Sequence, residues 1–409
     1  MDHVLQITQP TRSNMQQPFE TLLDTIESQG PLSAATQLAD HYRSAGQYTE
    51  LFEATKMQNR LGIGLSAVAT DGEAPSSPQQ NEALERGLIN ACLEVGSGLL
   101  EQGKLQEGWM YMRAVGDHQA ARECLAKHQV TGDNLDSYLN IFVQEGVDIG
   151  RGVKLMLEYR GTCNTITTLE SVVAMRDRKD QQSGVGPLVR RVHADLLESL
   201  QSDLRRRELT VKVESNSIGP IAAIMKAHPS LLSDGSYHLD TSHLSSTVRF
   251  ARVLDDRDDL ILALDLARYG RQLHTQYQYA SEEPFADLYL MSTYFFSVLL
   301  GENTEACLKP FLQKAESLDV SEHGTIGIET YVDLLARIGR YEESLQFLIK
   351  RMPRGTRPFG VAPSLIELSS LAHNFKPMLE QSKDRNDLLG FAAALLQSKS
   401  FEDSKADGS

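Results

Sequence analysis

Two histidines and an aspartate lie close together in the second half of the chain. His238, Asp240 and His243 fall within six residues, and imidazole and carboxylate groups are common ligands of zinc-like ions. The same groups could transfer protons as a general acid and base. Their spacing is not the HExxH pattern of a helical zinc site. A second interpretation therefore stays open, in which Asp240 caps the following helix and the histidines line a groove or the surface.

A second polar cluster spans residues 277–289, where tyrosines accompany Glu283 and Asp287. Paired carboxylates beside aromatic rings are typical of sites that cleave or isomerise sugars. The alternative is that these acids flank the start of a helix at Pro284 and interact with its dipole.

The two clusters could share one rim of a closed ring of helices. An α/α-toroid enzyme acting on a carbohydrate-like substrate would then use five candidate catalytic residues. These are His238, Asp240, His243, Glu283 and Asp287.

A third candidate is Cys163, in the polar segment 159–165. A nucleophilic thiolate would need a nearby base, and folding would have to supply His193 or His238. The alternative is a packed, unreactive thiol. The four cysteines of the chain include no CxxC pair, which argues against a zinc knuckle or a redox couple. Glycine-rich phosphate loops and a GxSxG motif are also missing, so we expect no cofactor.

The elements that would position these residues read as helices, because apolar residues recur at helical spacing along most of the chain. Between Leu188 and Leu204 they recur every four residues, the spacing of a buried helix face. The pattern predicts helices that include Phe19–Ser28, Leu84–Glu101, Ser242–Leu254, Asp258–Leu273, Phe285–Leu300 and Ile326–Ile338. Thr167 and Glu170 predict a capping box at a helix start. Only residues 208–215 alternate as a strand would, and we interpret them as an extended linker or small ribbon.

Three predicted helical hairpins share one internal frame around a turn glycine. A small residue lies seven positions before the glycine, a large residue four before it and an apolar residue two after it. The glycines are Gly46, Gly103 and Gly339, although Val332 is larger than the frame requires in the third hairpin. Small residues allow two helices to approach closely, and glycine relieves the tight turn.

These hairpins resemble tetratricopeptide repeats in a degenerate, irregularly spaced form. The resemblance implies an all-α fold of stacked antiparallel helical hairpins, an α-solenoid, with an α/α toroid as the alternative. The glycines lie 57 and then 236 residues apart, whereas a tandem array repeats every 34 or so. We therefore expect a degenerate helical-repeat fold and not a regular array.

Polar, aperiodic stretches predict the domain organisation. We expect a disordered N-terminus (residues 1–17), an N-terminal hairpin region (18–178), a linker (179–187), a C-terminal hairpin region (188–397) and a disordered tail (398–409). Such segments lack the apolar side chains that a packed core requires.

The charge balance and the apolar pattern limit the class of partner. A formal charge of −15 and a pI near 5.2 argue against nucleic acid, which selects a basic surface. The arginines between Arg190 and Arg207 are interspersed with acids such as Asp195 and Glu198. No run of 18 apolar residues predicts a membrane span and no basic–apolar leader begins the chain, so we expect a cytoplasmic protein.

The leading functional hypothesis is a non-enzymatic scaffold. Stacked hairpins present successive inner helices on a concave face, which typically binds a peptide or a partner helix. The sequence leaves open the toroid enzyme, the identity of the partner and the oligomeric state.

Overall fold

The computed structural model consists of helices joined by short connections. It describes residues 12–70, 75–209, 219–278, 284–353 and 358–406, and these contain no strand. They divide into two compact units, the first ending at Gly152 and the second beginning at Val153. The predicted all-α class is therefore confirmed. Within the described ranges, no helix has the length and apolar character needed to cross a membrane.

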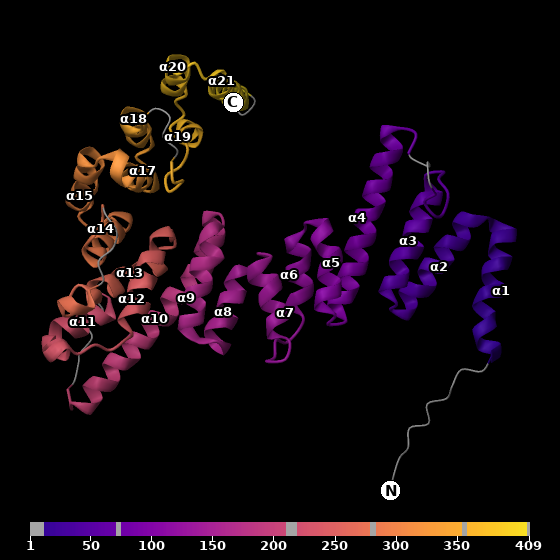
Figure 1. Cartoon of the computed structure of the whole chain (residues 1–409), viewed down its shortest axis with the longest axis horizontal. Helices are drawn as coiled ribbons and strands as arrows, with labels where there is room; N and C mark the ends of the chain where they lie inside the picture. Colours follow the sequence, from indigo (N-terminus) through magenta and orange to yellow (C-terminus); the bar gives the residue numbers. More distant parts are fainter. Residues whose placement is uncertain (1–11, 71–74, 210–218, 279–283, 354–357, 407–409) are drawn as a thin grey trace, which may run out of the picture. The chain divides into compact units, whose positions relative to one another are not determined.

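The first unit is a series of helices that pack against their neighbours in sequence (Figure 1). Its elements are α1 (Arg12–Gln29), α2 (Pro31–Ala45), α3 (Tyr48–Gly62), α4 (Pro78–Glu101), α5 (Leu105–Val115), α6 (His118–Ala126), α7 (Leu135–Leu139) and a π-helical turn (Asn140–Gln144). One core cluster joins α2, α3 and α4 through Ala39, Leu51 and Val95. The helix α8 (Ile149–Tyr159) contains the boundary between the units.

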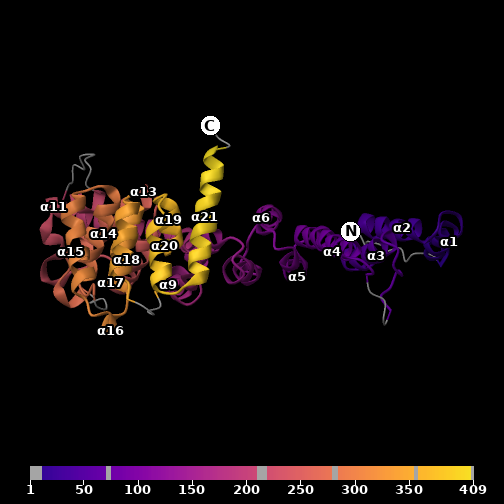
Figure 2. The ribbon, with the colours of Figure 1, turned by 90° about the horizontal axis from the view of Figure 1, so that it is seen from above.

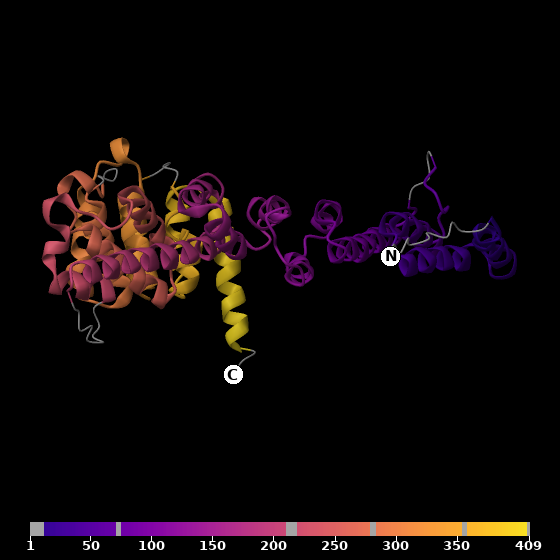
Figure 3. The same cartoon turned by 90° about the horizontal axis from the view of Figure 1, so that it is seen from below.

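The second unit holds the remaining helices. They are α9 (Gly161–Ser171), α10 (Arg178–Arg206), α11 (Pro220–Ala227), α12 (Thr241–Phe250), α13 (Arg257–Gly270), α14 (Leu288–Leu300), α15 (Thr304–Ser317), α16 (Val320–His323), α17 (Ile326–Arg337), α18 (Tyr341–Arg351), α19 (Leu365–Leu371), α20 (Lys376–Asp384) and α21 (Leu388–Ala406). Short 3-10 turns cover Val173–Met175, Pro229–Gly235, Ala251–Val253 and Thr275–Tyr277. The long α10, visible in Figure 3, packs against α9, α11, α12 and α13. Figure 2 shows α18, α19, α20 and α21 following one another along this unit.

All three predicted turn glycines end a helix of a hairpin. Gly46, Gly103 and Gly339 have φ of 65°, 75° and 79°, a left-handed conformation that glycine adopts without steric cost. They separate α2 from α3, α4 from α5, and α17 from α18, and the helices of each pair pack together. The small residues Ala39 and Gly96 are buried, as the frame requires.

The predicted linker at 179–187 is wrong, because these residues lie inside α10. Asp177 caps this helix by accepting a hydrogen bond from the Asp180 N–H at 2.9 Å. Gly186 is buried, and a Cβ there would lie 2.8 Å from Asp259 Oδ2. Gly186 therefore allows close packing on α13, and the unit boundary falls in α8 instead.

Other local predictions also changed. Residues 12–17 belong to α1, and α21 continues to Ala406, so these parts of the predicted disordered ends are helical; residues 1–11 and 407–409 lie outside the described residues. The capping box at Thr167 is wrong, because α9 begins at Gly161 and the Thr167 hydroxyl donates to the Cys163 carbonyl at 3.2 Å. The predicted extended segment 208–215 lies outside the description from residue 210 onward.

Close helix contact at Gly108 generates a stability prediction. A Cβ at this position would lie 2.8 Å from the Leu100 backbone nitrogen, whereas one at Gly62, in the last turn of α3, would meet nothing within 4 Å. We expect Gly108→Ala to lower the free energy of unfolding by about 1–3 kcal/mol through overpacking. The control Gly62→Ala should raise it by up to about 1 kcal/mol through helix propensity. Urea denaturation followed by circular dichroism measures both, and equal effects would contradict the close contact.

Candidate functional site

Asp240 caps the helix that follows it. Its Oδ1 accepts hydrogen bonds from the backbone N–H groups of Ser242 at 2.8 Å and His243 at 3.2 Å, at the start of α12. The hydrogen bond from the Ser242 hydroxyl, together with these amides, lowers the pKa of the Asp240 carboxyl. This is the alternative that the sequence left open for Asp240.

His238 lies in a buried hydrogen-bond network. Its Nε2 is 3.1 Å from Asp203 Oδ2 and its Nδ1 is 3.3 Å from the Tyr269 hydroxyl. The His238 N–H also donates to that hydroxyl at 3.0 Å. These contacts join the segment before α12 to α10 and α13. This hydrogen-bond network therefore connects three elements.

Asp203 is ionised within this hydrogen-bond network despite its burial. Burial opposes its charge, but hydrogen bonds from His238, Arg206 and Arg207 outweigh that effect and lower the pKa of the carboxyl to about 2. Burial raises the pKa of the Tyr269 hydroxyl to about 12.

The remaining catalytic candidates do not belong to this hydrogen-bond network. Asp287 caps α14 by accepting the Leu290 N–H at 3.0 Å, and Glu283 lies outside the described residues. In the part of the chain that the structure describes, no hydrogen bond or ion pair links His238, Asp240 or His243 to Asp287. Among all the residues that the structure describes, no group of three or more His, Cys, Asp or Glu side chains could hold a metal ion.

Cys163, the third candidate, and His193, one of its two possible bases, have separate surroundings. Cys163 is exposed on α9, while His193 is buried on α10 with its Nε2 2.9 Å from Asp265 Oδ2. Asp265 also accepts the N–H groups of Ile221 at 3.0 Å and Ala222 at 2.8 Å. It thereby satisfies the free amides at the start of α11 from the neighbouring helix α13.

The arginines considered for nucleic acid are paired with acids. Arg190 contacts Asp259 at 2.7 Å and Arg191 contacts Asp195 at 2.9 Å. Arg207 contacts Asp203, also at 2.9 Å. These ion pairs therefore lie within α10 or join it to α13.

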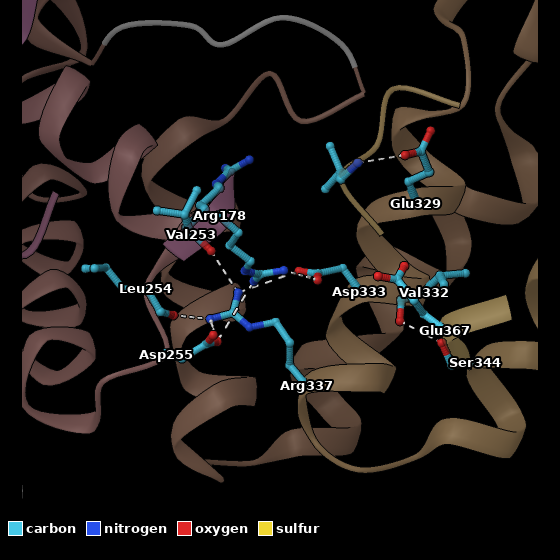
Figure 4. Close-up of polar contacts among 12 residues, drawn as sticks. Arg178, Val253, Leu254, Asp255, Glu329, Val332, Asp333, Arg337, Ser344 and Glu367 are labelled. Atoms are coloured by element: carbon cyan, nitrogen blue, oxygen red, sulfur yellow. Dashed lines mark hydrogen bonds and ion pairs between the residues drawn. The ribbon is translucent and has the colours of Figure 1, made fainter. Parts of the chain in front are cut away.

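A partly buried ion network connects α17 to segments that precede it (Figure 4). Asp333 accepts a hydrogen bond from Arg178 at 2.7 Å, and Arg337 lies 2.8 Å from Asp255. Burial alone would lower the pKa of Arg178, but the hydrogen bond and charge of Asp333 raise it. Burial lowers the pKa of Arg337, which also donates to the backbone carbonyls of Arg252 and Leu254.

One carboxylate holds the connection between α18 and α19 onto α17. Glu329, 1% exposed, accepts the N–H groups of Phe359 at 2.7 Å, Gly360 at 2.8 Å and Val361 at 2.9 Å. Its Oε1 also accepts a hydrogen bond from the Thr325 hydroxyl. Three of these donors are consecutive backbone N–H groups held by one buried side chain. We therefore call residues 358–361 the clamped loop.

The clamped loop forms one wall of an apolar groove of about 440 Å³. The other walls come from α18, α19 and α20. Most of the lining is apolar and includes Leu348, Ile349, Met352, Ala362 and Leu365. These residues belong to or pack on the core cluster of α17, α18 and α19, so the groove is an open continuation of that core.

The sequence patterns did not indicate Glu329 or Asp333. Both lie in a helix that is otherwise strongly apolar, and an acid within an apolar stripe requires buried partners. That signal marks both residues. Periodicity could not identify their partners, because these are distant in sequence: Arg178, the partner of Asp333, is 155 residues away.

Comparison with known proteins gives no relative for this chain. No family model, no curated protein and no solved structure matches it.

The low pKa of Asp203 predicts a pH-dependent stability. A carboxyl with a pKa of about 2 in the folded state and about 3.9 in the unfolded state stabilises the fold above about pH 4, by about 2 kcal/mol. That contribution is lost as the pH falls from about 4 to about 2. The difference in unfolding free energy between wild type and Asp203→Asn should therefore be constant near neutral pH and shrink in this window. A difference that does not change with pH would contradict the prediction.

Replacing the clamping carboxylate should release the clamped loop. Glu329→Gln keeps the size of the side chain but replaces one acceptor oxygen with a donor group, which would face N–H groups. Hydrogen bonds to a charged group contribute about 1.5–3 kcal/mol each, so we expect a loss of at least about 2 kcal/mol in unfolding free energy. Hydrogen exchange of the 359–361 amides should speed up, whereas Glu367→Gln, at the exposed start of α19, should leave these amides protected.

Proposed function

We propose that this chain is a non-enzymatic interaction scaffold of stacked, tetratricopeptide-like helical hairpins. In this proposal the groove of α17–α20 receives an apolar peptide segment of a partner protein. The observation that carries it is the groove itself, which leaves part of the core of a folded unit open. Apolar clefts with a few polar groups are typical of binding sites.

The size and lining of the groove favour an extended segment. A volume of about 440 Å³ suits a few large apolar side chains and not a whole helix. Most polar groups that line it have local partners: Glu329 binds the clamped loop, and Glu367 binds the Ser364 hydroxyl and N–H, both at 2.7 Å. Arg385 donates to the Met352 carbonyl at 3.4 Å, and Gln381 also lines the groove. Recognition would therefore depend on apolar contact and shape.

The environments of the catalytic candidates favour the scaffold over the toroid enzyme. Asp240 and Asp287 are engaged as helix caps, and His238 is buried between Asp203 and Tyr269. A site for proton transfer needs its groups within reach of one substrate. The groove is lined by none of these residues.

A peptide selection tests the proposal. Random peptides displayed on phage would be selected on the immobilised full chain, and the enriched peptides measured by isothermal titration calorimetry. We expect them to carry adjacent large apolar residues and to bind with micromolar Kd. Filling the groove with Ala362→Trp should weaken binding at least tenfold, or about 1.4 kcal/mol.

Lys350→Trp is the matched control. Lys350 is exposed on α18 and does not line the groove, so the same bulky side chain there should change the Kd by less than about twofold. Peptides that bind the Ala362→Trp variant as tightly as wild type would refute the groove as the binding surface.

A further inference from the structure

The first helix of the chain leaves an apolar stripe uncovered. One side of α1 faces α2, where Pro18 and Leu22 line a small cavity together with Leu38. On an adjoining side, Phe19, Leu23 and Ile26 are 71%, 60% and 45% exposed. Their spacing of four and three residues places them on one helix face.

An acidic stripe runs beside the apolar one. Glu20, Asp24 and Glu27 each follow one residue after a member of the apolar stripe, and all three are exposed. Residues 18–29 contain no Lys, Arg or His. Among the side chains that the structure describes, none forms an ion pair or hydrogen bond with these three carboxylates.

The Lys and Arg residues of α2 and α3 are already engaged, and Arg60 donates to the Ser66 carbonyl at 2.7 Å. His41 of α2 lines the small cavity beside α1. Arg43 pairs with Asp40 and Glu94, and Lys56 contacts Glu53 at 2.9 Å. A second copy of residues 18–29 would bring another acidic stripe and no Lys, Arg or His to meet the first. Charge complementarity therefore selects a partner of opposite sign.

We propose that the exposed face of α1 binds a basic amphipathic helix of a partner protein. The apolar residues of that helix would cover Phe19, Leu23 and Ile26, and its Lys or Arg residues would face Glu20, Asp24 and Glu27. An amphipathic helix binds such a surface through apolar side chains at helical spacing. Complementary charge sets the orientation of the helix and speeds association. This surface is distinct from the groove of α17–α20 and does not depend on it.

The test uses a defined probe and the full chain. The probe is a fluorescein-labelled helical peptide of about 18 residues, with Leu along one stripe and Lys along both edges. A second peptide has Glu in place of every Lys. Fluorescence anisotropy should show that the Lys peptide binds at least about tenfold more tightly than the Glu peptide, and that salt weakens its binding.

Neutralising the acidic stripe isolates its contribution. The triple variant Glu20→Gln, Asp24→Asn, Glu27→Gln should bind the Lys peptide about tenfold more weakly, because three exposed ion pairs are lost. The control variant Glu158→Gln, Glu198→Gln, Asp384→Asn removes the same charge from exposed positions of the second unit. It should change the Kd by less than about twofold.

Two outcomes overturn the proposal. If both triple variants weaken the Lys peptide equally, the attraction is a general effect of the net charge. If the Glu peptide binds wild type as well as the Lys peptide does, charge does not select the partner. As a gain-of-binding check, Glu20→Lys, Asp24→Lys, Glu27→Lys should bind the Glu peptide more tightly than wild type does, which misfolding cannot produce. Ala362→Trp should leave binding of the Lys peptide unchanged, which separates this surface from the groove.

Discussion

A buried carboxylate must be surrounded by donors, and the second unit is organised around this constraint. Glu329 and Asp265 each accept backbone N–H groups from a different segment of the chain. Asp203 and Asp333 instead meet histidine or arginine side chains. An unpaired buried charge is far more costly than the pair. Each acid therefore fixes the position of an element that apolar packing alone would leave free to slide.

The part of the fold that local spacing determines could be predicted from the sequence. The helical period of residues 188–204 marks a buried face of α10, and the three turn glycines mark the ends of helices in three hairpins. These features depend on neighbours within a few positions. The cap at Asp240 belongs to the same class, because its partners are the next two or three residues.

The remaining features depend on residues that are distant in the chain. Gly186 suggested a loop, but in the fold it allows close approach to Asp259. The groove arises from α17 to α20 and a connection whose path is set by Glu329. His238 and Asp240 also show this dependence, because they are close in sequence but have different partners: His238 contacts Asp203 and Tyr269, whereas Asp240 caps α12.

The manner in which the clamped loop is attached affects which of its side chains can vary. Glu329 contacts only main-chain N–H groups of residues 359–361, while the side chains of Phe359 and Val361 are exposed. Amino-acid identity at these two positions can therefore drift without loosening the anchor. Only Gly360, with φ of 86°, is constrained by its backbone. Such a loop separates the means of attachment, which is main-chain, from the side chains exposed to solvent, so the exposed surface can change while the loop keeps its position.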